Sequence, residues 1–360
     1  MQKYARTRSL LAPLLTVLVG AGAASASEAA AFRIYVSNEK SNDVTVIDGI
    51  THQVLATVAV GKRPRGLHVS RDGATVYVAL SGSPITGPPA AAGVKGIPAH
   101  DDDEAASKAD KSADGIGVID ARRLIFSHKF AVGSDPEQFA LADDGKHLYI
   151  ANEDVATASI IDLASEKVVQ LVAVGKEPEG VAISPNGAFF YVTCEATGDL
   201  FAVSRTDSSI LAHLTIGGRP RSVAFTLDGA KAFVASETNA SVYVLDTARQ
   251  VVTRVIKLEG GETMRPMGSL MSMDGKKVYI STGRGGRVAV IDSAQETLLT
   301  TIAVGPRPWG LAQSPDGTQL LVANGPSNDI SLVDLVTEKE TARIKVGQSP
   351  WGIAVGPAFK

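Results

Sequence analysis

One repeat of about 42 residues runs through almost the whole chain and constrains its fold more than any other feature. Each repeat opens on a proline, and successive prolines lie 72, 42, 42, 46, 42 and 42 residues apart, at Pro64, Pro136, Pro178, Pro220, Pro266, Pro308 and Pro350. An Asp-Gly or Asn-Gly pair keeps the same phase in six repeats, for example at Asp72-Gly73 and Asn186-Gly187. A regular period of this length is typical of repeat architectures.

Short runs of β-branched and aromatic residues, separated by turn residues, fill each repeat. In the repeat that opens at Pro178 these runs are 180–184, 190–194, 200–204 and 210–216. This is strand chemistry rather than the 3.6-residue period of helices. Four strands in about 42 residues make a propeller blade. The sequence therefore predicts an all-β fold, a seven-bladed β-propeller of four-stranded antiparallel blades.

The two ends of the chain share one blade in this interpretation. Residues 33–60 contain a second, third and fourth strand but no proline-led first strand, and residues 350–355 contain a first strand alone. Pairing the two ends would close the ring and remove exposed strand edges. We expect the last blade to be closed by the N- and C-terminal strands.

The N-terminus has the order of a secretory signal peptide. Lys3, Arg6 and Arg8 precede an apolar run at 10–19, and small residues lead to Ala26, where we expect cleavage. The run is too short to span a bilayer of roughly 30 Å. Residues 1–26 are thus predicted to be a Sec-type signal peptide, and residues 27–360 a single propeller domain in the periplasm with no membrane span after cleavage.

Charge and cysteine content exclude several classes of function. The chain has 35 Lys and Arg against 38 Asp and Glu, and loss of three positive residues with the signal peptide gives 32 − 38 = −6. Nucleic acid is therefore not expected as a partner. Cys194 is the only cysteine, so neither an internal disulfide nor a covalently attached c-type haem is possible.

Two insertions interrupt the period. The larger adds 30 residues (72 − 42) between the second and third strands of one blade, at about 81–115, and the smaller adds four residues near 259–263. Because alternate loops of an antiparallel blade lie on opposite faces, both insertions should open on the face where the proline-led strands begin. We take this face as the functional one.

The large insertion is acidic. Its run Asp101, Asp102, Asp103 and Glu104 offers oxygen ligands for a hard cation. The run lacks the alternation and the glycine of a calcium loop, which favours a solvated or partner-contacting segment instead. These four residues are weak metal candidates, and no metal site is predicted elsewhere.

Residues next to the repeat prolines are the main binding candidates, since they vary while the frame does not. At the channel mouth they would form a charged and aromatic rim able to bind an anionic or aromatic ligand, with arginine as a fork and tryptophan as a stacking plane. The alternative is that they form salt bridges and packing contacts between blades. The candidates are Arg63, Arg65, Glu137, Glu179, Arg219, Arg221, Arg265, Arg307, Trp309 and Trp351, with Asp135 and Glu177 also beside prolines.

Other polar residues are weaker candidates. His68 is the polar exception at a first-strand position where the other repeats have Ala or Leu, and it could ligate a metal or haem, although a single histidine is more often a packing residue. Second strands end in asparagine in three repeats, followed by a glutamate in two of them, at Asn38, Asn152, Asn324, Glu39 and Glu153. Cys194 occupies the equivalent asparagine position in its own repeat, and we expect it to be a buried, inert thiol.

Recurring tetrapeptides resemble the YVTN propeller repeat: Tyr35-Val36-Ser37-Asn38, Tyr149-Ile150-Ala151-Asn152 and Tyr191-Val192-Thr193-Cys194. Segments such as Arg63-Pro64-Arg65-Gly66 and Glu177-Pro178-Glu179-Gly180 are further similar to seven-repeat proteins associated with PQQ-dependent catabolism. This resemblance implies a periplasmic protein linked to quinoprotein alcohol oxidation and transport. It carries over no catalytic residues, and the acidic insertion departs from the family's uninterrupted repeat.

Catalytic motifs are missing from the sequence: it has no Gly-x-Ser-x-Gly elbow, no His-Glu-x-x-His and no phosphate loop. We therefore expect a non-catalytic binding or accessory protein, functionally linked to PQQ, whose partner is a periplasmic redox or transport protein or a small anionic or aromatic ligand. The alternative is a propeller enzyme, either a metal-dependent lactonase-like hydrolase or a haem- or quinone-linked oxidoreductase. With only two Trp, the repeated Trp pattern of propeller quinoproteins is absent.

Overall fold

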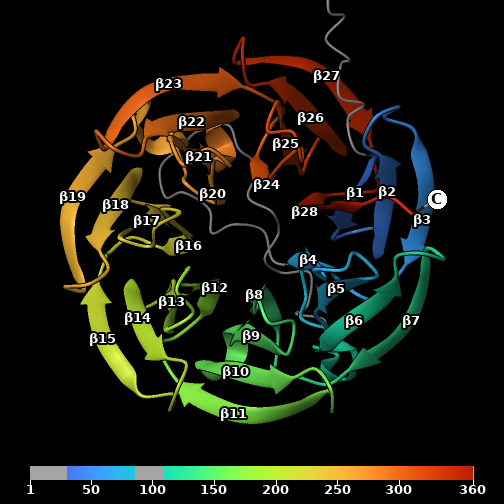
Figure 1. Cartoon of the computed structure of the whole chain (residues 1–360), viewed down its shortest axis with the longest axis horizontal. Helices are drawn as coiled ribbons and strands as arrows, with labels where there is room; N and C mark the ends of the chain where they lie inside the picture. The colour runs from blue at the N-terminus through green and yellow to red at the C-terminus, as the bar shows by residue number, and fades with distance from the viewer. Residues whose placement is uncertain (1–30, 86–108, 360) are drawn as a thin grey trace, which may run out of the picture.

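Seven four-stranded antiparallel sheets surround a central axis in the computed structural model, which describes residues 31–85 and 109–359 (Figure 1). The predicted seven-bladed, all-β propeller is confirmed. We number the blades by their prolines, so that blade 1 follows Pro64 and blade 7 contains Pro350. The predicted signal peptide and the run Asp101, Asp102, Asp103 and Glu104 lie outside the described residues.

Blades 1 to 6 are each built from four consecutive strands, with the first strand nearest the axis (Figure 1). Blade 1 contains β4 (Leu67–Val69), β5 (Thr75–Leu80), β6 (Gly115–Asp120) and β7 (Ile125–Phe130). Blade 2 contains β8 (Pro136–Leu141), β9 (His147–Asn152), β10 (Thr157–Asp162) and β11 (Lys167–Ala173). Blade 3 contains β12 (Pro178–Ile183), β13 (Phe189–Cys194), β14 (Asp199–Ser204) and β15 (Ile210–Thr215).

The next three blades repeat this pattern. Blade 4 contains β16 (Pro220–Phe225), β17 (Lys231–Ser236), β18 (Ser241–Asp246) and β19 (Val251–Lys257). Blade 5 contains β20 (Ser269–Met271), β21 (Lys277–Ser281), β22 (Arg287–Asp292) and β23 (Thr297–Ala303). Blade 6 contains β24 (Pro308–Gln313), β25 (Gln319–Asn324), β26 (Asp329–Asp334) and β27 (Lys339–Lys345).

Blade 7 joins the two ends of the chain. It orders β28 (Pro350–Pro357), β1 (Phe32–Asn38), β2 (Asp43–Asp48) and β3 (Val54–Ala59). In the antiparallel register of β1 and β28, Tyr35 lies opposite Ala354 and Val36 opposite Ile353. The predicted closure is confirmed, and it leaves neither terminal strand as a free edge.

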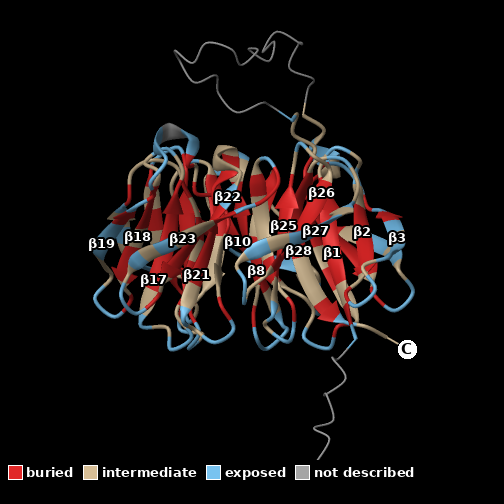
Figure 2. Cartoon of the chain, turned by 90° about the horizontal axis from the view of Figure 1, so that it is seen from above, coloured by how far each residue is buried: buried red, intermediate tan, exposed pale blue. Residues whose placement is uncertain are grey.

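The hydrophobic core lies between neighbouring blades rather than within one sheet. One buried cluster, for example, joins Tyr35, Val44 and Val46 of blade 7 to Val76 and Val78 of blade 1. Seen edge-on, the molecule is a flat disc whose buried residues lie in the strands and whose exposed residues gather in the turns at its two faces (Figure 2). Each blade is thus stabilised by burial against the next one.

The aspartates that end the third strands start turns. Asp48 accepts hydrogen bonds from the backbone N–H groups of Ile50 and Thr51 at 2.9 and 2.7 Å. Asp120 does the same for Arg122 and Arg123, both at 2.9 Å. Because the aspartate side chain bonds the backbone of its own turn and so stabilises it, the repeated Asp belongs to the frame of the propeller.

The opposite face carries the starts of the proline-led strands, and we call it the Pro-led face. Four short 3₁₀ helices lie there. η2 (Glu153–Val155) and η4 (Gly283–Gly285) follow second strands, whereas η1 (Lys111–Ala113) precedes a third strand and η3 (Gly261–Thr263) precedes a first strand. Both ends of the large insertion also open there, since Arg63 donates from Nη1 to the carbonyl of Ser83 at 2.8 Å. Among the described residues, no helix is long and apolar enough to cross a membrane.

Candidate functional site

In four blades the residue that follows the repeat proline is held by a side chain of the preceding blade. A buried or half-buried hydroxyl of that blade donates to the residue's carbonyl oxygen, as Ser37 does to Arg65 at 2.5 Å, Thr193 to Arg221 at 3.0 Å and Ser281 to Trp309 at 2.6 Å. At Gly180 the approach is so close that a Cβ atom would lie 2.1 Å from the Arg221 carbonyl. These contacts fix the backbone at Arg65, Arg221 and Trp309 against the preceding blade.

The residue before the proline adopts a left-handed backbone in four blades where it is charged. The φ angles are 44° for Arg63, 49° for Asp135, 51° for Glu177 and 49° for Arg307. Glycine or asparagine would adopt this conformation at lower cost. Ser349 of blade 7 has the same conformation, with a φ of 57°, so the left-handed residue belongs to the turn before the proline.

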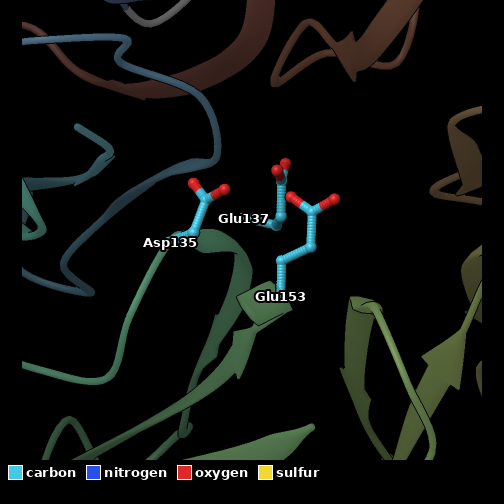
Figure 3. A group of neighbouring side chains, drawn as sticks. All are labelled: Asp135, Glu137 and Glu153. Carbon is cyan, nitrogen blue, oxygen red and sulfur yellow. The ribbon is translucent and has the colours of Figure 1, made fainter. Parts of the chain in front are cut away.

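Six carboxyl groups of blades 2 and 3 gather at the channel mouth, and we call them the acidic arc. Blade 2 contributes Asp135, Glu137 and Glu153, whose carboxyl groups lie side by side above the ribbon (Figure 3). Blade 3 contributes the equivalent residues Glu177, Glu179 and Glu195. Four of the six are almost fully buried, with exposed fractions of 1% for Glu137 and 3% for Asp135, Glu179 and Glu195.

Two arginines from the flanking blades contact this arc, with side chains that are 10% exposed in Arg65 and 12% exposed in Arg221. Arg65 of blade 1 forms ion pairs with Glu137 and, at 3.7 Å, with Glu153. Arg221 of blade 4 pairs with Glu179 at 3.1 Å and also with Glu195. Since each pair joins two blades, the expected alternative of inter-blade salt bridges holds for these two candidates.

Two further arginines extend the ion pairs outward. Arg63 pairs with Glu39 at 3.1 Å, and Arg219 contacts Glu195 directly. Glu237 accepts from Arg221 at 2.6 Å and lies 3.9 Å from Arg265. The flanks of the acidic arc are therefore a continuous network of charge pairs.

The opposite side of the mouth has different chemistry, and we call its residues Arg307, Trp309 and Trp351 the Arg–Trp arc. The two indole rings lie 5.2 Å apart and are tilted by 34°. The guanidinium carbons of Arg307 and Arg221 lie 5.5 and 5.6 Å from the Trp309 ring centre. Cation–π contacts of this kind orient the guanidinium groups without neutralising them.

Burial shifts several titrations in the acidic arc. It raises the pKa of Glu153 to about 7, with Asp135 and Glu195 adding to the rise and Arg65 opposing it. It also raises the pKa of Glu179 to about 8, although Arg221 lowers it. For Glu237 the effect of burial is outweighed by Arg221, and its pKa is lowered. The arc thus contains groups that can bind and release protons near neutrality.

Two carboxylate triads have the geometry of a metal site. The ligand oxygens of Asp135, Glu137 and Glu153 lie within 4.8 Å of one another, and so do those of Glu153, Glu177 and Glu195. Glu153 belongs to both triads.

The candidates predicted beside the prolines meet at the channel mouth, but some other candidates do not reach it. His68 packs edge-on against Phe139 at 4.9 Å, and burial lowers its pKa. The amide of Asn152 donates to Ser159 at 2.7 Å inside blade 2, and Asn38 and Asn324 bond to Thr45 and Ser331 in the same way. These three asparagines therefore belong to the frame. Cys194 is fully buried, which raises its pKa to about 12.

Sequence reasoning overlooked Glu195 and Glu237. Both follow the end of a second strand, the repeat position already occupied by Glu39 and Glu153. Following that position through every repeat would have found them.

Comparison with known proteins supports the fold. No protein-family model and no curated protein matches the chain. Among solved structures, it is similar to the periplasmic gluconolactonase PpgL of Pseudomonas aeruginosa, with 18% identity, a TM-score of 0.69 and coverage of 91% of this chain and 99% of that one. Hydrazine synthase of Kuenenia stuttgartiensis matches with 21% identity and a TM-score of 0.69, covering 83% and 91%.

A third similar structure is apo AztD from Citrobacter koseri, with 16% identity, a TM-score of 0.62 and coverage of 92% and 100%. At such identities these likenesses show the propeller fold. The two arcs and their flanking arginines together surround the channel mouth, and we call them the collar.

Proposed function

We propose that this chain is a periplasmic, non-catalytic binding protein whose Arg–Trp arc binds a small planar anion. One observation carries the proposal: the two Trp residues of the chain lie together at the channel mouth beside Arg307. Within the described residues, Arg307 forms no ion pair with a carboxylate, and burial lowers its pKa. A half-buried guanidinium without a counter-ion favours an anionic ligand.

The chemistry of the arc narrows the ligand class. Arginine binds carboxylates through two parallel N–H groups, and indole rings stack on flat conjugated systems. A planar aromatic carboxylate satisfies both. The resemblance to PQQ-associated propellers makes PQQ, a planar aromatic carboxylate, the first probe. The signal-peptide pattern and the fold shared with a periplasmic gluconolactonase support the compartment, where a redox or transport protein would be the partner.

Calorimetric titration with PQQ tests the proposal. We expect Arg307→Gln and Trp351→Phe each to weaken binding at least about tenfold, which is roughly 1.4 kcal/mol. Arg123→Gln is the matched control, because Arg123 is an exposed arginine in a turn on the opposite face. Absence of PQQ binding, or binding that Arg307→Gln leaves unchanged, would contradict the proposal.

A second candidate function is lactone hydrolysis at the acidic arc. It is favoured by Glu153, whose pKa of about 7 suits a general base and which lies 3.7 Å from Arg65. The fold shared with PpgL adds an analogy at the level of the fold. Hydrolysis of glucono-1,5-lactone followed in a pH-stat, with Glu153→Gln as the inactive variant, distinguishes this function from pure binding. A visible spectrum of the purified protein tests the haem- or quinone-linked alternative.

A further inference from the structure

The acidic arc has more negative charge than its arginines can balance. It contains six carboxyl groups, and three guanidinium groups contact them, those of Arg65, Arg219 and Arg221. Four of the six carboxyl groups form an ion pair with one of these arginines, whereas Asp135 and Glu177 form none within the part of the chain that the structure describes. Two of these arginines are also shared, Arg65 with Glu39 at 3.3 Å and Arg221 with Glu237 at 2.6 Å.

Among the described residues, one buried oxygen of this arc has neither a hydrogen-bond partner nor an ion pair. Oδ1 of Asp135 is buried and accepts no hydrogen bond, and the residue is 3% exposed. The carboxyl group lies beside those of Glu137 and Glu153 (Figure 3). A buried carboxylate oxygen without a donor or cation is costly to maintain. The orphaned oxygen therefore marks a position for an electropositive ligand.

The spacing of the oxygens fits a cation of moderate size. Ca²⁺ binds oxygen ligands at about 2.3–2.6 Å, so ligands on opposite sides of the ion are roughly 5 Å apart. The oxygens of Asp135, Glu137 and Glu153 lie within 4.8 Å of one another. Ligands of this kind, all carboxylate oxygens, suit Ca²⁺, Mn²⁺ or Mg²⁺ and disfavour softer ions.

We propose that the acidic arc binds one hard divalent cation through Asp135, Glu137 and Glu153, with Glu153 shared between this triad and Glu177 and Glu195 of blade 3. The cation partners the orphaned oxygen of Asp135 and offsets part of the excess negative charge. It also links blade 2 to blade 3 at the channel mouth. The site is separate from the Arg–Trp arc and does not depend on the proposed anion binding.

Titration of EDTA-treated protein with CaCl₂, MnCl₂ and MgCl₂ by calorimetry tests the site. We expect one ion per chain for at least one of these metals, and a rise in Tm on its addition. Asp135→Asn and Glu153→Gln should each weaken binding at least tenfold. Glu259→Gln should bind as the wild type does, because Glu259 is exposed on the Pro-led face.

Circular dichroism of each variant shows whether it folds, and a metal-induced rise in Tm that is present in wild type and lost in folded Glu153→Gln provides a second readout. Two results would overturn the proposal. One is the absence of stoichiometric binding of all three ions to the wild type. The other is binding that survives Asp135→Asn and Glu153→Gln but is lost when Asp101, Asp102 and Asp103 are changed together to Asn.

Discussion

The acidic arc and the Arg–Trp arc occupy the same repeat positions, in blades that lie on opposite sides of the central axis (Figure 1), yet their chemistry is opposite. Glu137 and Glu179 follow their prolines in blades 2 and 3, as Trp309 and Trp351 do in blades 6 and 7. The backbone beneath is alike, since a glycine of the preceding blade lies against the carbonyl of both Glu137 and Trp309, where a Cβ atom on Gly66 or Gly268 would be 2.9 or 2.5 Å away. The comparison shows that the repeated backbone determines the position of each side chain at the channel mouth, whereas the residue after each proline determines which kind of ligand that position can bind.

The largest effect should come from removing the strand that completes the Arg–Trp arc. Deleting residues 350–360 removes β28, which pairs with β1 and carries the buried Trp351 and Ile353. We expect the ring to open, unfolding to lose cooperativity and Tm to fall by more than about 10 °C. Scanning calorimetry measures this, and an unchanged, cooperative transition would show that the ring closes without β28.

Removing the arginine Arg221, which contacts the acidic arc, and Arg307, which belongs to the Arg–Trp arc, should separate a structural role from a binding role. Arg221→Met leaves Glu179 buried without its cation and Glu195 with Arg219 alone, and we expect a loss of about 3 to 5 kcal/mol in the free energy of unfolding. Arg307→Met removes only a cation–π contact and should cost about 1 kcal/mol or less. Urea unfolding of both variants makes the comparison, and equal losses would contradict the assignment of roles.

The acidic arc should also make stability depend on pH. Burial raises the pKa of Glu179 from 4.5 to about 8, so between these values the folded state binds more protons than the unfolded state. Stability should therefore fall as the pH rises from about 5 to 8, by roughly 1 to 3 kcal/mol. In EDTA, Glu179→Gln should flatten this dependence, measured as Tm against pH. A slope that Glu179→Gln leaves unchanged would assign the effect to other groups.

The smallest losses of stability should be equal for a hydroxyl beside the acidic arc and one at the Arg–Trp arc. Ser37→Ala removes the hydroxyl that donates to Arg65, and Ser281→Ala the one that donates to Trp309. Each change should cost about 1 kcal/mol, because each leaves one buried carbonyl without this donor. Urea unfolding of the two variants side by side tests this, and a difference larger than about 1 kcal/mol would mean that the frame is not alike in the two regions.

Much of this molecule could be predicted from its sequence, because the repeat is so regular. The spacing of the prolines and of the Asp-Gly turns predicted seven blades, and the missing first strand before residue 33 predicted the closure by β28. Positions beside the prolines identified Arg65, Arg221 and Trp309 as residues of the channel mouth. The position of each residue within its repeat was sufficient for these conclusions.

The pairing of side chains across blades could not be predicted in the same way. Arg221 reaches Glu179, Glu195 and Glu237 from three blades, and such contacts depend on the curvature of the ring and the length of each side chain. The orphaned oxygen of Asp135 depends on the same details. The frame follows from local periodicity, whereas the balance of charge in the collar follows from distances between blades.

The central claim is that two arcs of one collar bind ligands of opposite charge. A crystal structure of the protein soaked with PQQ and MnCl₂, with anomalous data collected for manganese, tests it most directly. We predict planar density against Trp309 and Trp351 within reach of Arg307, and one anomalous peak among Asp135, Glu137 and Glu153. An empty collar, or ligands found only on the opposite face, would contradict the account.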